Sequence, residues 1–213
     1  SGRSFAGWYL QQFLKMGVAR HVDGLSEHYL LWDSDMVPLQ PLQWFRDNRT
    51  KVVFNTGGYI TRTYEKAYAR LVPGKKLYYQ RGWIMRTSLV THSMMIYKPY
   101  MNEMLNAFAG GAPSSGLQWA FRIMDVLDTK DVHKGFSEYA SYSTWVLDNH
   151  PESMALVPYR TWSRHPIGGT LTMTLLKWSN KHGLCCPSRW LLIMMRTLGN
   201  EFTGFEIGHF DCG

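Results

Sequence analysis

The sequence predicts an α/β fold, in which a sheet of short strands is flanked by helices. Short apolar runs that end at turn residues alternate along the chain with longer segments of helical apolar spacing. Apolar residues make up 45% of the 213 residues, which is enough to bury a substantial core. Two aspartates, Asp33 and Asp35, directly follow one of the apolar runs. Ligands of open α/β sheets bind beyond the carboxyl ends of strands, so this position is a candidate site.

Helical spacing of apolar residues recurs along the chain. The predicted helices cover residues 5–20, 63–71, 100–109, 117–127, 137–150 and 189–198. Pro99 should open the third of these helices, because its fixed φ suits a first helical turn. Ser137 should cap the fifth, with Phe136 before it as a hydrophobic staple residue.

Four apolar runs are predicted strands, over residues 28–33, 51–55, 88–99 and 154–160. His92 falls in the middle of the third. Residues 161–190 are rich in Gly, Ser, His and Pro and are expected to be mostly irregular. We expect one domain over residues 1–213, and its abrupt start on a helical pattern indicates a piece of a longer chain. No apolar run reaches the roughly 18 residues that a membrane span needs.

Charge and composition narrow the function classes. The formal charge is +7, which favours phosphate-bearing partners, but the basic residues are scattered and do not favour a dedicated nucleic-acid role. Three cysteines without a C-x-x-C spacing argue against a disulfide framework and a cysteine-based zinc site. Aromatic residues make up 15% of the chain, and we expect some of the rings to line a site for sugars or bases.

Asp33 and Asp35 are spaced so that both carboxylates can reach one cation at the end of the strand. Oxygen ligands suit Mg²⁺ or Mn²⁺, and Mg²⁺ prefers one or two carboxylates together with substrate phosphates. A polar turn whose aspartates cap backbone N–H groups is the simpler alternative. The apolar segments on both sides favour the metal site, because uncompensated charge between them would be costly.

One resemblance of this motif is to haloacid-dehalogenase-like phosphatases, whose nucleophile strand is followed by a pattern that "DSDMV" (33–37) fits. Their later acidic motif carries a glycine and follows a strand, and "DVLDTKD" (125–131) has neither. Their nucleophile strand is also usually the first element, whereas a predicted helix precedes it here. A phosphatase of this type is therefore the weaker alternative.

The sequence is more similar to GT-A-type glycosyltransferases, in four stretches that span residues 7 to about 160. Two of them, "GWYLQQFLKM" (7–16) and "YLLWDSDMVPLQPL" (29–42), look like the helix and metal strand of nucleotide-diphospho-sugar transferase domains. The third, "SLVTHSMMIYKPYMNEML" (88–105), resembles their central strand, where a Thr-His pair approaches the donor. The last, "GFSEYASYSTWV" (135–146), resembles their F-S-E-Y-x-x-Y-x-x-W signature and is the most specific of the four.

The resemblance implies a GT-A-like open sheet and a metal-bound donor. Asp33 and Asp35 are expected to hold Mn²⁺ or Mg²⁺ on the diphosphate of a nucleotide sugar, with UDP as the expected nucleotide. His165 is the expected third metal ligand, and His209 is the alternative. The expected donor-binding residues are Trp32, Ser34 and His92.

The resemblance also assigns the acceptor side. Glu138 matches the acidic residue of the signature and is the expected general base that deprotonates the acceptor hydroxyl. A carboxylate that only complements the helix dipole is the alternative for Glu138. Tyr142 and Trp145 share its helix face and are either an acceptor-sugar platform or ordinary core. Both the inverting and the retaining mechanism stay open.

The sequence departs from the GT-A pattern at its start. A GT-A fold normally begins with a β-α-β unit that binds the nucleotide base, and Asp33 lies so early that we expect this unit to be shortened or missing. A non-catalytic carbohydrate- or nucleotide-binding domain of the same fold is therefore the second functional hypothesis. For a transferase, the expected partners are a nucleotide-sugar donor and a glycan or glycoconjugate acceptor.

Overall fold

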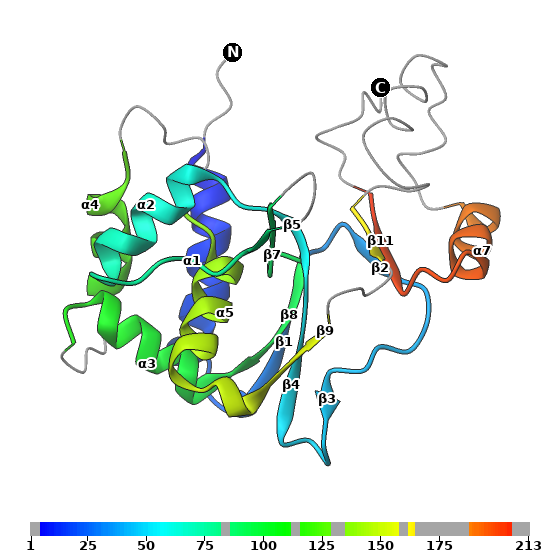
Figure 1. Cartoon of the computed structure of the whole chain (residues 1–213), viewed down its shortest axis with the longest axis horizontal. Coiled ribbons are helices and arrows are strands. Elements are labelled where there is room, and N and C mark those ends of the chain that lie inside the picture. Colours follow the sequence, from blue (N-terminus) through cyan, green and yellow to red (C-terminus); the bar gives the residue numbers. More distant parts are fainter. Residues whose placement is uncertain are drawn as a thin grey trace. The chain divides into compact units, whose positions relative to one another are not determined.

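The computed structural model describes residues 5–81, 86–111, 116–128, 135–157, 162–164 and 188–205. Helices and small mixed sheets make the fold α/β (Figure 1). The chain divides into two compact units that interleave in sequence. Unit 1 comprises Ser1–Leu31 and Phe45–Val157, and unit 2 comprises Trp32–Trp44 and Pro158–Gly213.

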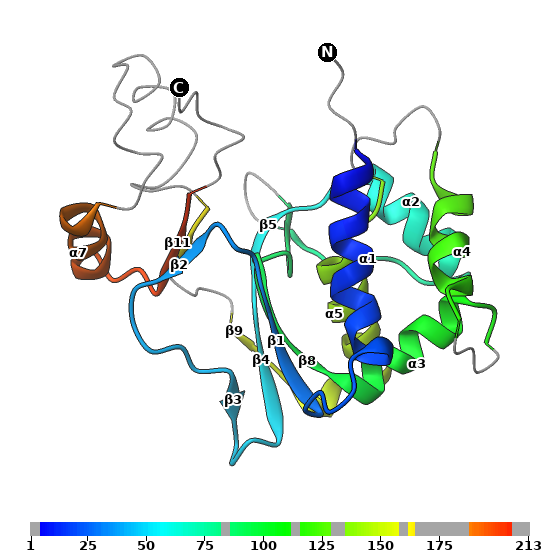
Figure 2. The ribbon, with the colours of Figure 1, turned by 180° about the vertical axis from the view of Figure 1, so that it is seen from behind.

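Five helices of unit 1 are among the described residues, and they pack against one another. Their bounds are α1 Ala6–His21, α2 Arg62–Leu71, α3 Lys98–Phe108, α4 Gln118–Val126 and α5 Glu138–Asn149. Helix α5 lies beside α1 and contacts α3 (Figure 1 and Figure 2). Every residue from 138 to 146 is buried, so the first three-quarters of α5 has no solvent face. Such a helix is held by packing on all sides rather than by one apolar stripe.

The described strands of unit 1, with β1 ending at the first residue of unit 2, form three small sheets. The first sheet pairs β1 His28–Trp32 with β8 Ser93–Tyr97. The second contains β3 Phe45–Arg46, β4 Lys51–Asn55 and β9 Met154–Val157. The third contains β5 Gly57–Tyr59, β6 Gln80–Arg81 and β7 Arg86–Ser88. Strands β4 and β9 run parallel, with Val52 opposite Met154, and β8 lies beside β4. Four of the five residues of β4 are buried, as expected for a strand covered on both faces.

Unit 2 contains a three-stranded sheet and one described helix. The sheet has the order β10 Trp162–Ser163, β11 Phe202–Gly204, β2 Met36–Pro38, and the helix is α7 Arg189–Thr197. Strand β11 runs antiparallel to β2 and parallel to β10. The apolar side of α7 contributes Leu191 and Met195 to a small core that includes Phe205.

Most of the predicted helices and strands are confirmed, and local sequence signals mark where the helices begin. The six predicted helices are found within about two residues of their predicted bounds, the usual uncertainty of a helix end. Pro99 lies in the first turn of α3, and the Ser137 hydroxyl caps α5 by accepting a hydrogen bond from the Ala140 N–H at 3.3 Å. Phe136 packs edge-on against Phe108 of α3, because the helix position that a staple would contact is the polar Ser141.

The predicted strand over residues 88–99 is wrong in its extent. Strand β7 ends at Ser88, β8 begins at Ser93, and the chain bends between them. His92 has φ of +57°, a left-handed backbone conformation that cannot continue a β-ladder. His92 therefore precedes β8 instead of lying in mid-strand. Among the described residues, no helix is long and apolar enough to cross a bilayer.

Candidate functional site

The first candidate site is the turn that carries Asp33 and Asp35, in unit 2. Strand β1 ends at Trp32, and the next residues form a turn closed by a hydrogen bond from the Met36 N–H to the Asp33 carbonyl at 3.0 Å. Both aspartates are half-buried, whereas Ser34 between them is exposed. One turn thus carries both predicted metal ligands and leaves the residue between them at the surface.

The backbone of this turn is held from two further directions. The Phe205 N–H donates a hydrogen bond to the Asp35 carbonyl at 2.8 Å, and the Trp32 indole N–H donates to the Met36 carbonyl at 2.9 Å. The bond from Phe205 links the turn to a segment that lies far away in sequence. Side chains mounted on a backbone fixed in this way are pre-organised for a ligand, because little freedom is lost on binding.

Aromatic rings and one glycine pack beneath the turn. The Phe202 ring stacks on Trp162 at a centroid distance of 5.4 Å and lies 5.6 Å from the Trp32 ring. Gly204 lies opposite Met36, and a Cβ on Gly204 would collide with the carbonyl oxygen of Arg164 and approach the Met36 sulfur. Glycine is therefore the residue that lets β10, β11 and β2 approach one another.

The donor set of the turn fits a hard divalent cation. Two carboxylates in one turn match the one or two that Mg²⁺ takes beside phosphate oxygens and water. Within the described ranges, no group of three or more His, Cys, Asp or Glu side chains could hold a metal. The predicted third ligand, His165, and its alternative, His209, both lie outside the described residues.

Of the predicted donor-binding residues, Trp32 and Ser34 belong to the turn itself, and His92 belongs to unit 1. Trp32 is half-buried, and its indole N–H is used in holding the turn. His92 is half-buried at the bend before β8.

Glu138, the predicted base, lies at the start of α5 in a buried ion pair. Its carboxylate is 2.8 Å from the Lys15 ammonium of α1, and the two side chains are 6% and 13% exposed. The Glu138 N–H donates to the Gln12 side-chain oxygen at 3.2 Å, and the Lys15 ammonium also lies 4.6 Å from the centre of the Tyr139 ring. One oxygen of the carboxylate, Oε1, is therefore engaged with α1.

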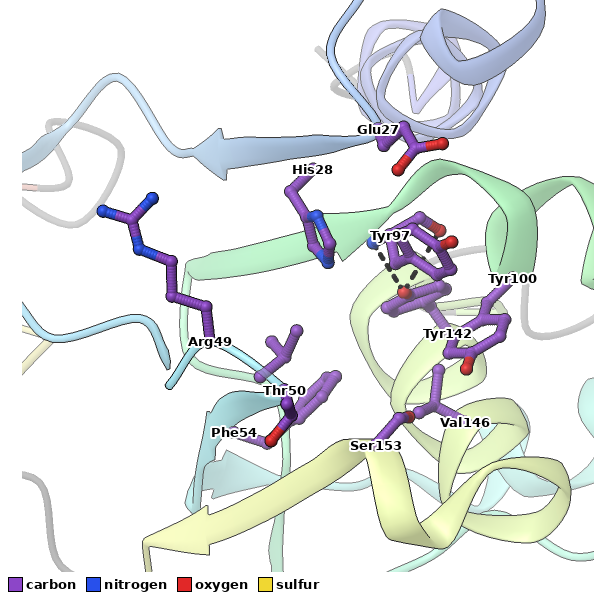
Figure 3. Close-up of a pocket in the computed structure, with 11 residues that line it drawn as sticks. Glu27, His28, Arg49, Thr50, Phe54, Tyr97, Tyr100, Tyr142, Val146 and Ser153 are labelled. Carbon is purple, nitrogen blue, oxygen red and sulfur yellow. Dashed lines mark hydrogen bonds between the residues drawn. The ribbon is translucent and has the colours of Figure 1, made fainter. Parts of the chain in front are cut away.

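A second candidate site is a cavity of about 250 Å³ in unit 1 (Figure 3). Eleven residues line it, and they are Glu27, His28, Arg49, Thr50, Val52, Phe54, Tyr97, Tyr100, Tyr142, Val146 and Ser153. Of the three α5 residues that the sequence singles out, Tyr142 lines this cavity, whereas Glu138 and Trp145 do not. The three residues of the predicted Glu138–Tyr142–Trp145 face therefore do not line one cavity together.

Tyr142 is fixed as a wall of the cavity. Its hydroxyl accepts a hydrogen bond from the Tyr97 N–H at 2.9 Å and donates one to the Tyr97 carbonyl at 3.4 Å. Burial raises the pKa of Tyr142 above its usual range, so this phenol stays protonated in the neutral pH range. Trp145 is buried, and its indole N–H has no hydrogen-bond partner among the described residues.

The sequence did not predict this cavity, because its residues come from separate strands, turns and helices. The available signal was the aromatic excess together with Tyr97 and Tyr100, which lie three residues apart at the junction of β8 and α3. Comparison with known proteins adds no family assignment: no family model, no curated protein and no solved structure matches the chain.

Proposed function

We propose that the chain is a metal-dependent glycosyltransferase domain of the GT-A type. It moves a sugar from a nucleotide-diphosphate donor, with UDP as the nucleotide, to a hydroxyl of a glycan or glycoconjugate. The observation that carries the proposal is the turn of Asp33 and Asp35, which directly follows a strand and is fixed by bonds from Met36 and Phe205. The resemblance of four sequence stretches to nucleotide-diphospho-sugar transferases supports the same assignment.

In this proposal Asp33 and Asp35 hold Mn²⁺ or Mg²⁺, with His165 as the third protein ligand. The bound metal supplies positive charge that stabilises the leaving diphosphate. The two carboxylates would position that charge, and the hydrogen bonds of the turn fix the backbone that carries them.

Glu138 stays the proposed base for the acceptor hydroxyl. The Lys15 ammonium lies 2.8 Å from the Oε1 atom of this carboxylate, and their charge-assisted bond would hold the carboxylate in place while it accepts the proton.

A second candidate function is a non-catalytic domain that binds carbohydrate or nucleotide. The specific observation in its favour is the same ion pair, since a carboxylate locked to Lys15 serves packing rather than proton transfer. The two functions agree on ligand binding and differ only in turnover. A transfer assay therefore separates them, whereas a binding assay does not.

The test of the proposed function is a thermal-shift panel of UDP, GDP, ADP and CDP, each with Mn²⁺, with Mg²⁺ and with a chelator. A ligand that binds only the folded state raises the unfolding temperature by mass action. We expect UDP and Mn²⁺ together to raise it, and each alone to raise it less. A set of UDP-sugars is then incubated with Mn²⁺ and glycan acceptors to measure transfer.

Each outcome of the panel has a defined meaning. Metal-dependent UDP binding with transfer supports the transferase, and the same binding without transfer supports the non-catalytic domain. If no nucleotide diphosphate shifts the unfolding temperature with either metal, the assignment of the Asp33–Asp35 turn as a donor site is wrong.

A further inference from the structure

We infer that the cavity in unit 1 is a binding subsite for one neutral sugar ring, which it holds without reacting with it. The described residues that line the cavity all belong to unit 1, whereas Asp33 and Asp35 belong to unit 2, so the cavity and the proposed donor site are built from different residues. The inference rests on the proposed function only in naming an acceptor glycan as the source of the ring. Binding itself requires neither metal nor nucleotide.

The size of the cavity favours a single ring. Its volume is about 250 Å³, just below the range of about 300–1,000 Å³ that is typical of small-molecule pockets. A nucleotide sugar, with its base, ribose, diphosphate and hexose, is much larger than such a cavity. One monosaccharide unit is the largest carbohydrate piece that we expect it to enclose.

The inner wall of the cavity is apolar and aromatic. Val52, Phe54, Tyr142 and Val146 are buried, and the Phe54 ring lies 6.3 Å from the Tyr142 ring. Tyr97 and Tyr100 are half-buried and stand edge to face at 4.7 Å. The C–H face of a sugar ring is apolar, so it packs on aromatic faces while its hydroxyl groups point to the rim.

The rim offers the polar groups that sugar hydroxyls need. Glu27 and Arg49 are exposed and lie on different sides of His28 in Figure 3, so one side of the rim accepts hydrogen bonds and the other donates them. The hydroxyls of Thr50 and Ser153 donate to backbone carbonyls at 2.6 Å and 2.8 Å. Their oxygens therefore keep lone pairs that can accept from a ligand.

The charges of the lining residues favour a neutral ligand. Glu27 and Arg49 carry opposite charges that cancel, and among the described lining residues they alone carry a permanent charge. Burial lowers the pKa of His28, an effect that Glu27 partly offsets, so its imidazole is neutral near pH 7. The hydroxyl groups of a neutral polyol can donate to the Glu27 carboxylate or accept from the Arg49 guanidinium without bringing a charge into the cavity.

The aromatic rings and the rim are held in place by contacts with one another and with neighbours outside the cavity. The Tyr100 ring stacks on His150 at 3.8 Å, and His150 in turn lies 2.7 Å from the Glu103 carboxylate. His28 stacks on Tyr97 at 4.6 Å. Asp47, Asn48 and Arg49 all have positive φ, so a tight left-handed turn between β3 and β4 presents the Arg49 side chain.

The experiment is ligand-observed NMR of the whole chain with methyl glycosides of glucose, galactose, mannose, xylose and N-acetylglucosamine, without metal or nucleotide. Tetramethylammonium serves as the cationic probe. We expect saturation transfer to at least one glycoside and none to tetramethylammonium. Glu27→Gln and Arg49→Ala should each weaken glycoside binding by about tenfold, the scale of a lost hydrogen bond to a charged group.

The matched control is Glu152→Gln, because Glu152 is an exposed glutamate next to Ser153 and does not line the cavity. It should leave glycoside binding unchanged. The inference is overturned if no glycoside binds, if Glu27→Gln and Arg49→Ala bind as well as wild type, or if tetramethylammonium binds instead. Failure of the proposed function is a separate result: loss of UDP binding with intact glycoside binding leaves this subsite standing.

Discussion

At the scale of single residues, the Glu138–Lys15 pair is the feature with the largest consequences. Two opposite charges in a largely buried position are stabilising only while both are present, because each alone would be an uncompensated charge. The pair joins the start of α5 to α1, and Gln12 adds a bond to the Glu138 backbone. The Glu138 carboxylate therefore contributes to stability and is also the proposed catalytic base.

Glu138→Gln should lower transfer by about 10²-fold or more if the carboxylate is the base. It should also lower the free energy of unfolding by about 3 kcal/mol, because Lys15 loses its counter-charge. UDP affinity should hardly change, since the proposed donor site is held by Asp33 and Asp35. Transfer rate, UDP affinity and urea unfolding are measured side by side.

The double variant Lys15→Met/Glu138→Leu separates the two roles of Glu138. Apolar residues of similar volume often replace a buried ion pair at little cost, so the double variant should regain most of the lost stability. A catalytic Glu138 predicts that it stays inactive. Recovery of both stability and transfer would show that Glu138 only holds α1 and α5 together.

His28 should make stability depend on pH. Burial lowers the pKa of His28 in the folded state below its usual value of about 6.5, so the unfolded chain binds more protons in the interval between the two values. Stability attributable to His28 is therefore present above about pH 6.5 and is lost as the pH falls. Urea midpoints at about pH 7.5 and about pH 5.5 should differ more for wild type than for His28→Gln. Equal differences for the two proteins would contradict this effect.

At the scale of elements, Gly204 controls how the unit 2 sheet packs. In Gly204→Ala the new methyl group would collide with the Arg164 carbonyl, and we expect a loss of about 1–3 kcal/mol in the free energy of unfolding. The shift of β11 should also weaken metal-dependent UDP binding, because Phe205 holds the Asp35 carbonyl. Gly7→Ala is the control: nothing lies within 4 Å of a Cβ there, and alanine favours the helix. Unchanged stability in Gly204→Ala would refute the packing argument.

The cap of α5 is a second element-scale test. The Ser137 hydroxyl accepts from the Ala140 N–H, so Ser137→Ala should cost about 1 kcal/mol of unfolding free energy. Ser188 precedes α7 in the same position, but its side chain makes no capping hydrogen bond. Ser188→Ala should therefore cost little, and chemical unfolding of the two variants compares them directly. A similar cost for both would mean that the cap is not the cause.

The helices were predictable from sequence because their signals are local. Apolar spacing, Pro99 and Ser137 fix where α3 and α5 begin without reference to the rest of the chain. Strands of two or three residues, such as β5 and β6, are too short to show a period and were missed. The strand predicted over residues 88–99 failed at His92, whose positive φ depends on its surroundings rather than on its neighbours in sequence.

At the scale of the molecule, the sequence could not show the division into two units. Strand β2 pairs with β11, more than a hundred residues later, and this pairing places the short excursion Trp32–Trp44 in unit 2. The alternation of strands and helices indicated one domain over residues 1–213, and this stays a prediction. For the same reason the aspartate pair was predictable as a local motif, whereas its support from Phe205 was not. The cavity likewise depends on long-range packing, which brings Glu27, Phe54 and Ser153 together.

The central claim is that Asp33 and Asp35 hold a divalent metal with a nucleotide diphosphate. The most direct measurement is calorimetric titration of UDP into wild type, Asp35→Asn and the control Asp23→Asn, each with and without Mn²⁺. Asp23 is exposed and lies outside the turn, and an asparagine at position 35 keeps the side-chain shape while removing its charge. We predict Mn²⁺-dependent UDP binding for wild type and Asp23→Asn, and its loss in a folded Asp35→Asn. Equal Mn²⁺-dependent affinity in all three proteins would contradict the account.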